Sequence, residues 1–187
     1  MFGRYKDDNV SYGIVGLGRF GYALAKALAE LDADLLILDK DEEKIKDMRE
    51  YTENALVIKN LDKPSLLETG IQNCDIAIVC IGEQMDISIL TTLHLVSMGI
   101  PKVVARATSA EHGEILEKLG AKVVFPERDM AERLAKRMEE ANMPEFAQLN
   151  DKVGIAKLIV ADEMEGESVY DADLETRFAV KLIAIES

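Results

Sequence analysis

A glycine-rich turn between two apolar segments constrains the fold of this chain more than any other stretch. Residues 11–15 form a short, mostly apolar run, the pattern Gly16-x-Gly18-x-x-Gly21 follows, and residues up to 31 have helical apolar spacing. This order predicts a strand, a tight turn and a helix, as in the first unit of a nucleotide-binding α/β sheet. We expect Gly16 to permit the turn, Gly18 to let backbone amides approach a phosphate, and Gly21 to let the helix pack closely on the sheet.

The start of the helix after this turn is a predicted phosphate site. Its unpaired N–H groups and roughly half a unit of positive charge favour an anion. A second apolar strand, residues 35–38, ends in Asp39, which lies 21 residues after Gly18 and is followed by Lys40. An acidic residue about 20 residues on accepts hydrogen bonds from ribose hydroxyls, so a nucleotide site is favoured over a purely structural turn. The predicted phosphate loop comprises Gly16, Leu17, Gly18, Arg19, Phe20 and Gly21.

The composition excludes several classes of protein. Of the 187 residues, 48% are apolar, which excludes wholesale disorder, and the formal net charge of −13 argues against nucleic-acid or anionic-lipid partners. No apolar run approaches the ~20 residues of a membrane-spanning helix, and the charged opening residues do not resemble a signal peptide. We therefore expect a cytoplasmic protein without direct membrane insertion. Cys74 and Cys80 flank and end an apolar strand without metal-ligand neighbours, which favours apolar filler over a disulfide or a site.

Strand-like and helix-like segments alternate over the first two thirds of the chain. After the first strand, further strands are expected at residues 35–38, 55–58, 76–81, 103–105 and 122–125. Six strands alternating with helices predict an α/β fold with a doubly wound parallel Rossmann sheet, in the order 3-2-1-4-5-6. Ligands bind at the carboxyl ends of such strands, where we place Asn60, Ile81, Gly82 and Arg106. The position of Arg106 favours pairing with a phosphate over pairing with a carboxylate.

Apolar spacing also predicts which helix faces are buried. The expected stripes comprise Leu24, Ala27, Leu28 and Leu31 on the first helix, and Ile87, Leu90, Thr91, His94 and Leu95 on the helix at 85–98. His94 has no second metal-type residue at helical spacing, so we interpret it as a core residue rather than a ligand. Thr108 to Glu111 form a predicted capping box for a helix that Gly120 ends, and we expect His112 in its first turn to lie at the surface.

The character of the sequence changes after the sixth strand. A helix is expected at residues 129–141, with Met130, Leu134, Ala135 and Met138 on one side and Pro144 beyond its end. This helix either packs on its own domain or crosses to a second subunit. Strands are expected at residues 153–160 and 179–185, around the acidic segment 162–173, and they are too few for an independent core. We therefore divide the chain into a nucleotide-binding domain (1–127), crossover or dimerisation helices (128–150) and the start of a truncated, partial α+β domain (151–187).

Five stretches together resemble one protein family. They are Gly-Ile-Val-Gly-Leu-Gly-Arg-Phe-Gly (13–21), the strand-end Asp39, Ile81-Gly82 before a helix rich in Leu and Thr, His-x-x-Ile-Leu-x-x-Leu-Gly-Ala (112–121) and Phe-Pro-Glu-Arg-Asp-Met (125–130). This combination is similar to RCK domains, also called KTN or TrkA-N domains, and in particular to the cytoplasmic regulatory subunits of Ktr/Trk potassium transporters. The likeness covers residues 10 to about 187.

The resemblance implies a ligand, partners and roles for particular residues. Family members bind ATP, ADP or NAD(H), form homodimers through a crossover helix, and assemble as tetramers of dimers, in octameric rings, beneath a potassium channel or transporter subunit of the membrane. By this resemblance the glycine loop holds phosphates, Arg19 reaches the terminal phosphate of ATP, and Asp39 holds the ribose. Asn60 lies near the base, Arg106 near phosphate, and Glu127 helps to bind a divalent cation such as Mg2+.

Three functions remain as hypotheses at this stage. The first is a regulatory subunit in which exchange of ATP for ADP changes the geometry of a dimer-based ring and thereby gates a potassium channel or transporter. The second is an NAD(H)-binding redox sensor, and the third is an NAD-dependent dehydrogenase. No segment after the sixth strand resembles a substrate domain, and neither His94 nor His112 has an evident acid–base partner. We therefore expect that the protein is not an enzyme.

Overall fold

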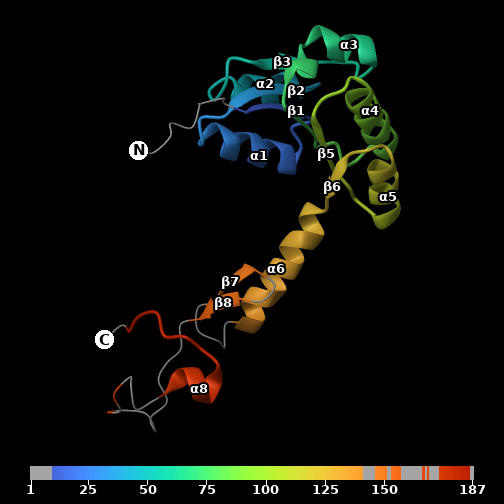
Figure 1. Ribbon diagram of the computed structural model, residues 1–187. Helices are drawn as coiled ribbons and strands as arrows, with labels where there is room; N and C mark the ends of the chain where they lie inside the picture. The colour runs from blue at the N-terminus through green and yellow to red at the C-terminus, as the bar shows by residue number, and fades with distance from the viewer. Residues whose placement is uncertain are drawn as a thin grey trace, which may run out of the picture. The chain divides into compact units, whose positions relative to one another are not determined.

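The computed structural model describes residues 10–140, 146–150, 153–156, 166, 168 and 173–185 (Figure 1). The chain divides into two compact units between residues 129 and 130. The first unit contains a six-stranded, fully parallel sheet in the order β3-β2-β1-β4-β5-β6, which confirms the predicted doubly wound fold. Its strands are β1 (Ser11–Val15), β2 (Asp34–Asp39), β3 (Ala55–Val57), β4 (Ile76–Val79), β5 (Lys102–Arg106) and β6 (Lys122–Val124).

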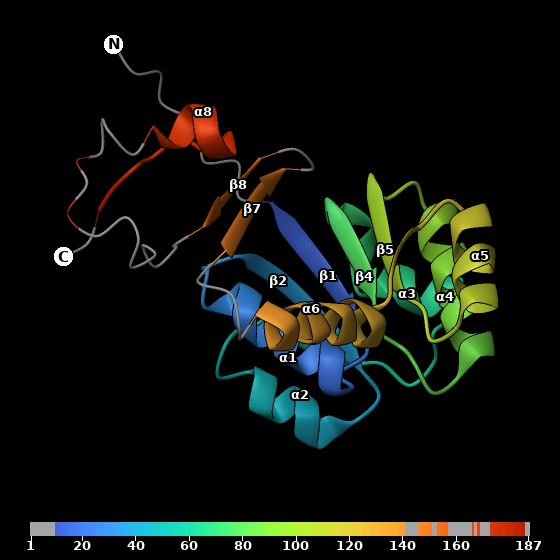
Figure 2. The ribbon, with the colours of Figure 1, turned by 90° about the horizontal axis from the view of Figure 1, so that it is seen from below.

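Helices cover both faces of this sheet (Figure 2). Consecutive strand residues point to opposite faces and both are buried: Ile14 belongs to the core on one face and Val15 to the core on the other. The first core packs against α1 and α2, and the second packs against α3, α4 and α5. The helices of this layer are α1 (Arg19–Ala29), α2 (Glu42–Met48), α3 (Lys63–Glu68), the 3-10 turn η1 (Ile71–Asn73), α4 (Met85–Ser97) and α5 (Ala110–Lys118).

The predicted buried stripe of α1 is partly wrong. Its fully buried residues are Gly21 and Ala25, while Ala27 is exposed and Leu31 lies beyond the end of the helix with 76% of its surface exposed. Gly21 and Ala25 are one helical turn apart, so they share a face. The helix therefore meets the sheet most closely through its smallest residues, because these allow the closest approach of the two backbones, while the predicted Leu24 and Leu28 are partly buried and pack against the same core.

The same correction applies to α4. Its buried residues are Ser88, Thr91, Thr92 and Leu95, whereas Leu90 is 52% exposed and His94 is only half-buried. The Thr92 hydroxyl donates a 2.8 Å hydrogen bond to the carbonyl of Ser88, which satisfies one buried polar group within the helix itself. The predicted Thr91 and Leu95 thus contact the core together with Ser88 and Thr92, whereas the predicted Leu90 and His94 lie to one side of this face.

The predicted surface position of His112 is wrong. The helix cap is Ser109, whose hydroxyl accepts a 3.2 Å hydrogen bond from the backbone N–H of His112, so the predicted capping box begins one residue too early. The cap does not determine which face of the helix is buried; His112 lies one turn before the buried Leu116 and shares its face toward the core. Its ring is fully buried, with Nδ1 lying 3.3 Å from the Thr108 hydroxyl, and Nε2 has no hydrogen-bond partner.

The long helix after the sheet begins earlier than predicted. α6 spans Pro126–Glu140 rather than starting at residue 129, and β6 ends at Val124. A proline fits the first helical position because the N–H it lacks has no partner there in any helix. Met130, Leu134 and Met138 are 58%, 54% and 69% exposed, so the predicted apolar side of this helix faces outward in the isolated chain.

The second unit contains a two-stranded sheet and a short helix. β7 (Phe146–Asn150) pairs antiparallel with β8 (Val153–Ala156), so the expected helical character up to residue 150 is wrong for these five residues. Cross-strand pairing supplies the hydrogen bonds there, and helical spacing cannot reveal such a partner. Residues 157–160 of the predicted strand lie outside the described residues, as does Pro144, and residues 166, 168 and 173 are the described part of the acidic segment.

The predicted strand at residues 179–185 does not form. The helix α8 (Leu174–Phe178) precedes it, and residues 180–185 have no ladder partner among the described residues. An apolar alternating segment becomes a strand only when a neighbouring strand accepts its hydrogen bonds. Within the described ranges, none of the helices combines the length and the apolar character that crossing a lipid bilayer requires.

Burial of His112 predicts a pH-dependent stability. Desolvation lowers the pKa of this imidazole below its ordinary value of 6.5, so the folded protein disfavours the proton that the unfolded chain accepts. The free energy of unfolding should therefore fall as the pH drops from 7 through 6.5, until the lower folded pKa is reached. In the variant His112→Gln, the free energy of unfolding should fall less over this pH range. Urea titrations at pH 7.0, 6.0 and 5.5 measure it. Parallel pH profiles for the two proteins would contradict this role.

Candidate functional site

A cavity of about 1220 Å³ opens at the carboxyl ends of the parallel strands. It lies where the strand order reverses between β1 and β4, which is the usual ligand position in doubly wound sheets. Every predicted site residue except Gly21 lines it. These residues are Gly16, Leu17, Gly18, Arg19, Phe20, Asp39, Lys40, Asn60, Ile81, Gly82, Arg106 and Glu127.

The loop between β1 and α1 has the geometry of an anion cradle. Gly16 has φ +98°, a left-handed conformation that favours glycine, and its N–H donates a 2.8 Å hydrogen bond to the carbonyl of Leu38. Gly18 is the N-cap of α1 and provides no side-chain cap, and the first helical turn has no acidic residue. No carboxylate of the helix itself therefore offsets the N-terminal amides and the positive end of the helix dipole.

Two glycines of the loop serve opposite purposes. A Cβ on Gly21 would lie 2.0 Å from the carbonyl oxygen of Gly16 and 2.9 Å from Cβ of Cys80, so this position holds the helix against the strand. A Cβ on Gly18 would meet no atom within 4 Å. Gly18 thus leaves a space open on the cavity side of the loop, where a ligand can approach the backbone.

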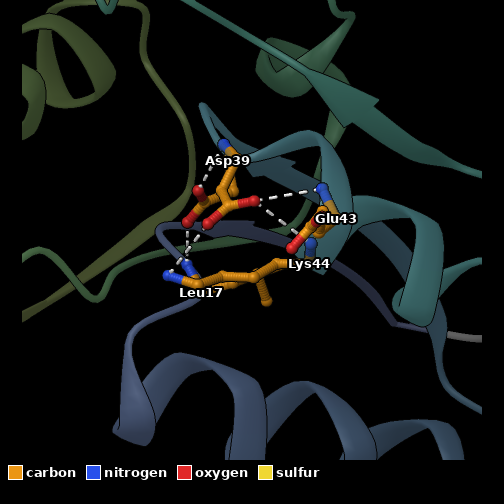
Figure 3. A network of polar contacts seen from close by, with 5 residues as sticks. Leu17, Asp39, Glu43 and Lys44 are labelled. Carbon is orange, nitrogen blue, oxygen red and sulfur yellow. Dashed lines mark hydrogen bonds and ion pairs between the residues drawn. The ribbon is translucent and has the colours of Figure 1, made fainter.

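Asp39 ties the glycine loop to the second strand (Figure 3). The backbone N–H of Leu17 donates to one carboxylate oxygen, and the N–H of Asp41 donates to the other over 2.8 Å. The residue is 9% exposed. Each carboxylate oxygen can accept more than one hydrogen bond, so Asp39 keeps acceptor capacity toward the cavity while it orders the loop.

Arg106 and Glu127 form an ion pair at the other side of the cavity. Arg106 Nη2 donates to Glu127 Oε1 over 2.5 Å, with 18% of the arginine side chain and 67% of the glutamate side chain exposed. The hydrogen bond from Arg106 lowers the pKa of Glu127 below its ordinary value, and the charge of Arg19 contributes a smaller part. Gly82 makes room for this arginine, because a Cβ there would lie 1.8 Å from Nη1.

Helix α4 contributes a wall that sequence reasoning assigned to the core. Ile87, Leu90, Thr91 and His94 line the cavity, and Asp62 and Lys59 lie near the predicted base-side residue Asn60 along the chain. The signal was present as an i, i+3, i+4, i+7 pattern that begins soon after β4 ends. This pattern identifies a helix face but does not distinguish packing against the sheet from lining a cleft.

The donor set at the site favours an organic anion over a resident metal. Among the described residues, no group of three or more His, Cys, Asp and Glu side chains could hold a metal ion. Cys80 also lines the cavity, but burial raises the pKa of its thiol to about 12, so it is neutral at pH 7. Both cysteines are free and buried, as expected for apolar filler.

Two glycine substitutions should have contrasting effects on stability. Gly21→Ala forces a methyl group against backbone and should destabilise the fold by at least about 2 kcal/mol, because neither neighbour can yield easily. Gly18→Ala enters open space at an ordinary backbone conformation and should cost less than about 1 kcal/mol. Thermal and urea unfolding of the matched pair measure this difference, and equal losses would contradict the packing role of Gly21.

Asp39 should contribute to the stability of the fold by ordering the glycine loop. In Asp39→Asn one carboxylate oxygen becomes an N–H donor, which leaves one of two backbone amides without its acceptor. We expect a loss of about 1–3 kcal/mol in urea unfolding at pH 7. The control Asp41→Asn keeps a side chain that caps α2 and should change stability by less than about 0.5 kcal/mol. If both variants unfold alike, Asp39 does not order the loop.

Comparison with known proteins gives one consistent result. The family model for the TrkA-N domain matches residues 12–127. The Ktr system potassium uptake protein C of Bacillus subtilis (strain 168) is 31% identical over 176 residues, which cover 94% of this chain and 80% of that protein. The Ktr system potassium uptake protein A of the same organism is 31% identical over 185 residues, covering 98% of this chain and 82% of that protein.

Solved structures show the same fold at lower identity. The TrkA-N domain of the inner membrane protein YbaL from Escherichia coli superposes with a TM-score of 0.60 at 19% identity, covering 71% of this chain and 98% of that one. GsuK bound to ADP gives a TM-score of 0.56 at 23% identity, over 73% of this chain and 35% of that one. The GsuK channel bound to NAD superposes with a TM-score of 0.54 at 17% identity, covering 79% of this chain and 27% of that one.

Proposed function

The chain belongs to the TrkA-N domain family, and on that premise we propose that it is a nucleotide-binding regulatory subunit of a membrane potassium transporter or channel. The observation that carries the proposal is that an uncapped helix N-terminus, the carboxylate of Asp39 and two arginines converge on one cavity. Relatives that bear the name of potassium uptake proteins support the choice of process. A partner in the membrane would place the protein at the cytoplasmic face.

The proposed ligand is an adenine nucleotide, ATP or ADP. Its phosphates would rest on the amides of the loop from Gly16 to Gly21, with Arg19 on the terminal phosphate and Arg106 on a phosphate nearer the sheet. Asp39 would accept hydrogen bonds from the ribose hydroxyls, and its negative charge disfavours a ribose that carries a 2′-phosphate. Asn60 would lie beside the base. We propose that Lys40, next to Asp39, contributes a further positive charge to the lining of the cavity.

A divalent cation would bind only together with the nucleotide. Glu127 is a single carboxylate, and Mg2+ in nucleotide sites takes one or two carboxylates together with phosphate oxygens and water. We propose Glu127 as that carboxylate, with the phosphates as the remaining ligands. Without phosphate oxygens, the described residues offer no comparable group of ligands.

Regulation would follow from a difference in affinity between two states of an assembly. We propose that α6 pairs with a second copy through the exposed side chains Met130, Leu134 and Met138, giving a homodimer and then a ring built as a tetramer of dimers. ATP or ADP can shift such an assembly only as far as each prefers one geometry. The energy for gating then comes from differential binding, and the protein needs no catalytic activity.

A second candidate is an NAD(H)-binding redox sensor. The cavity of about 1220 Å³ has room for a dinucleotide, and the glycine loop does not distinguish the two pyrophosphate ligands. In this case the ratio of NADH to NAD+ would set the state of the assembly. We prefer the ATP/ADP regulator because the proposed position of Arg19 suits a third phosphate, which NAD(H) does not have.

Calorimetric titration of the full chain with ATP, ADP, NADH and NAD+ tests the proposal. Arg19→Ala should weaken ATP binding by about tenfold or more and ADP binding by less than about threefold, because only ATP offers the γ-phosphate. The control Arg49→Ala removes an exposed arginine outside the cavity and should bind like the wild type. Binding of NADH without binding of ATP would support the sensor instead, and binding of none of the four would overturn both.

A further inference from the structure

The ion pair between Arg106 and Glu127 joins two parts of the chain with different roles. Arg106 is the last residue of β5 and lines the cavity, while Glu127 lies in the first turn of α6. α6 continues past residue 129, where the first compact unit ends, and carries the chain into the second unit. The 2.5 Å contact therefore fixes the start of the helix that leaves the nucleotide-binding unit.

The guanidinium of Arg106 can exchange partners. Its side chain is 18% exposed, and its Nε is buried without a hydrogen-bond partner. An arginine has five N–H donors in a planar fork, which matches two oxygens of a phosphate as well as it matches a carboxylate. The guanidinium lies against Gly82, in the space that a Cβ at this position would fill. A phosphate in the cavity would meet a guanidinium that is partly exposed there, and it would carry more charge than Glu127.

The carboxylate of Glu127 lines the same cavity as Arg106 and the glycine loop. It lines the cavity with Gly18 and Arg19, and the charge of Arg19 is close enough to lower its pKa. A phosphate placed between the loop and Arg106 would compete for the arginine and repel Glu127, because both anions are negative. At the same time the 67% exposure of Glu127 lets it turn into solvent at little cost.

We propose that the Arg106–Glu127 pair is a phosphate-sensitive contact that holds the first turn of α6, and that a bound nucleotide releases it by taking Arg106. This inference rests on the proposed nucleotide site and adds the route by which that site reaches α6. The pair and the phosphate are alternatives for one guanidinium, so binding of one weakens the other by the same factor. Loss of the pair leaves the beginning of α6 with fewer contacts to β5.

Amide hydrogen exchange of the full chain, with and without saturating ATP, tests the release. The buffer contains EDTA and no magnesium, which excludes the cation role of Glu127. In the wild type, ATP should speed exchange of the amides at residues 130–133 by about threefold or more, because the first turn opens more often. Glu127→Gln should show the faster exchange without ATP and no further change with it. It should also bind ATP about threefold more tightly, since the competing carboxylate is gone.

A matched variant separates this contact from a general charge effect. Asp129→Asn removes one negative charge from the same helical turn without removing a contact to Arg106, and it should keep the wild-type response to ATP. An unchanged response in Glu127→Gln, or a response that appears only with Mg2+, would overturn the proposed release while leaving nucleotide binding intact. Failure of the wild type to bind ATP in calorimetry would instead overturn the proposed function itself.

Discussion

The close approach of α1 to β1 is the contact on which the rest of the structure depends. Gly21 sits so near the carbonyl of Gly16 that any side chain there would collide with backbone. This approach lets the first turn of α1 face the carboxyl ends of the strands, because the loop between them has only three residues, 16–18. Asp39 then secures that loop from the neighbouring strand through the N–H of Leu17. Phosphate recognition in this family of folds begins with these two constraints.

The cavity contains positively charged side chains although the chain as a whole is strongly negative. The protein has a formal net charge of −13, yet Arg19 and Arg106 both line the cavity, and the first turn of α1 has no acidic residue. An anionic ligand is therefore attracted locally and repelled by most of the remaining surface, which favours binding at this one place. Three of the four carboxylates that line the cavity accept hydrogen bonds: Asp39 from two backbone amides, Asp62 from the N–H of Ser65, and Glu127 from Arg106.

Predictions of elements were more successful than predictions of faces. The strand order, the glycine turn and the convergence of the site residues followed from spacing, since parallel strands bring their carboxyl ends to one edge. The burial of His112 did not follow from spacing, because a position in the first turn of a helix does not show which face of that helix packs on the core. Nor did the exposure of Leu90, because α4 packs through Ser88 and Thr92, whose small size matters more at a close contact than their polarity.

By itself, the sequence determined the αβ alternation, the phosphate loop, the acid at the end of β2 and the resemblance that names the family, because each depends on residues close together in the chain. Only the tertiary structure decided that Arg106 pairs with Glu127, that α4 forms a wall of the cavity, and that residues 180–185 have no strand partner among the described residues. Those outcomes depend on which distant groups meet after folding. Local spacing records a face or a charge, but the partner is chosen by packing in three dimensions.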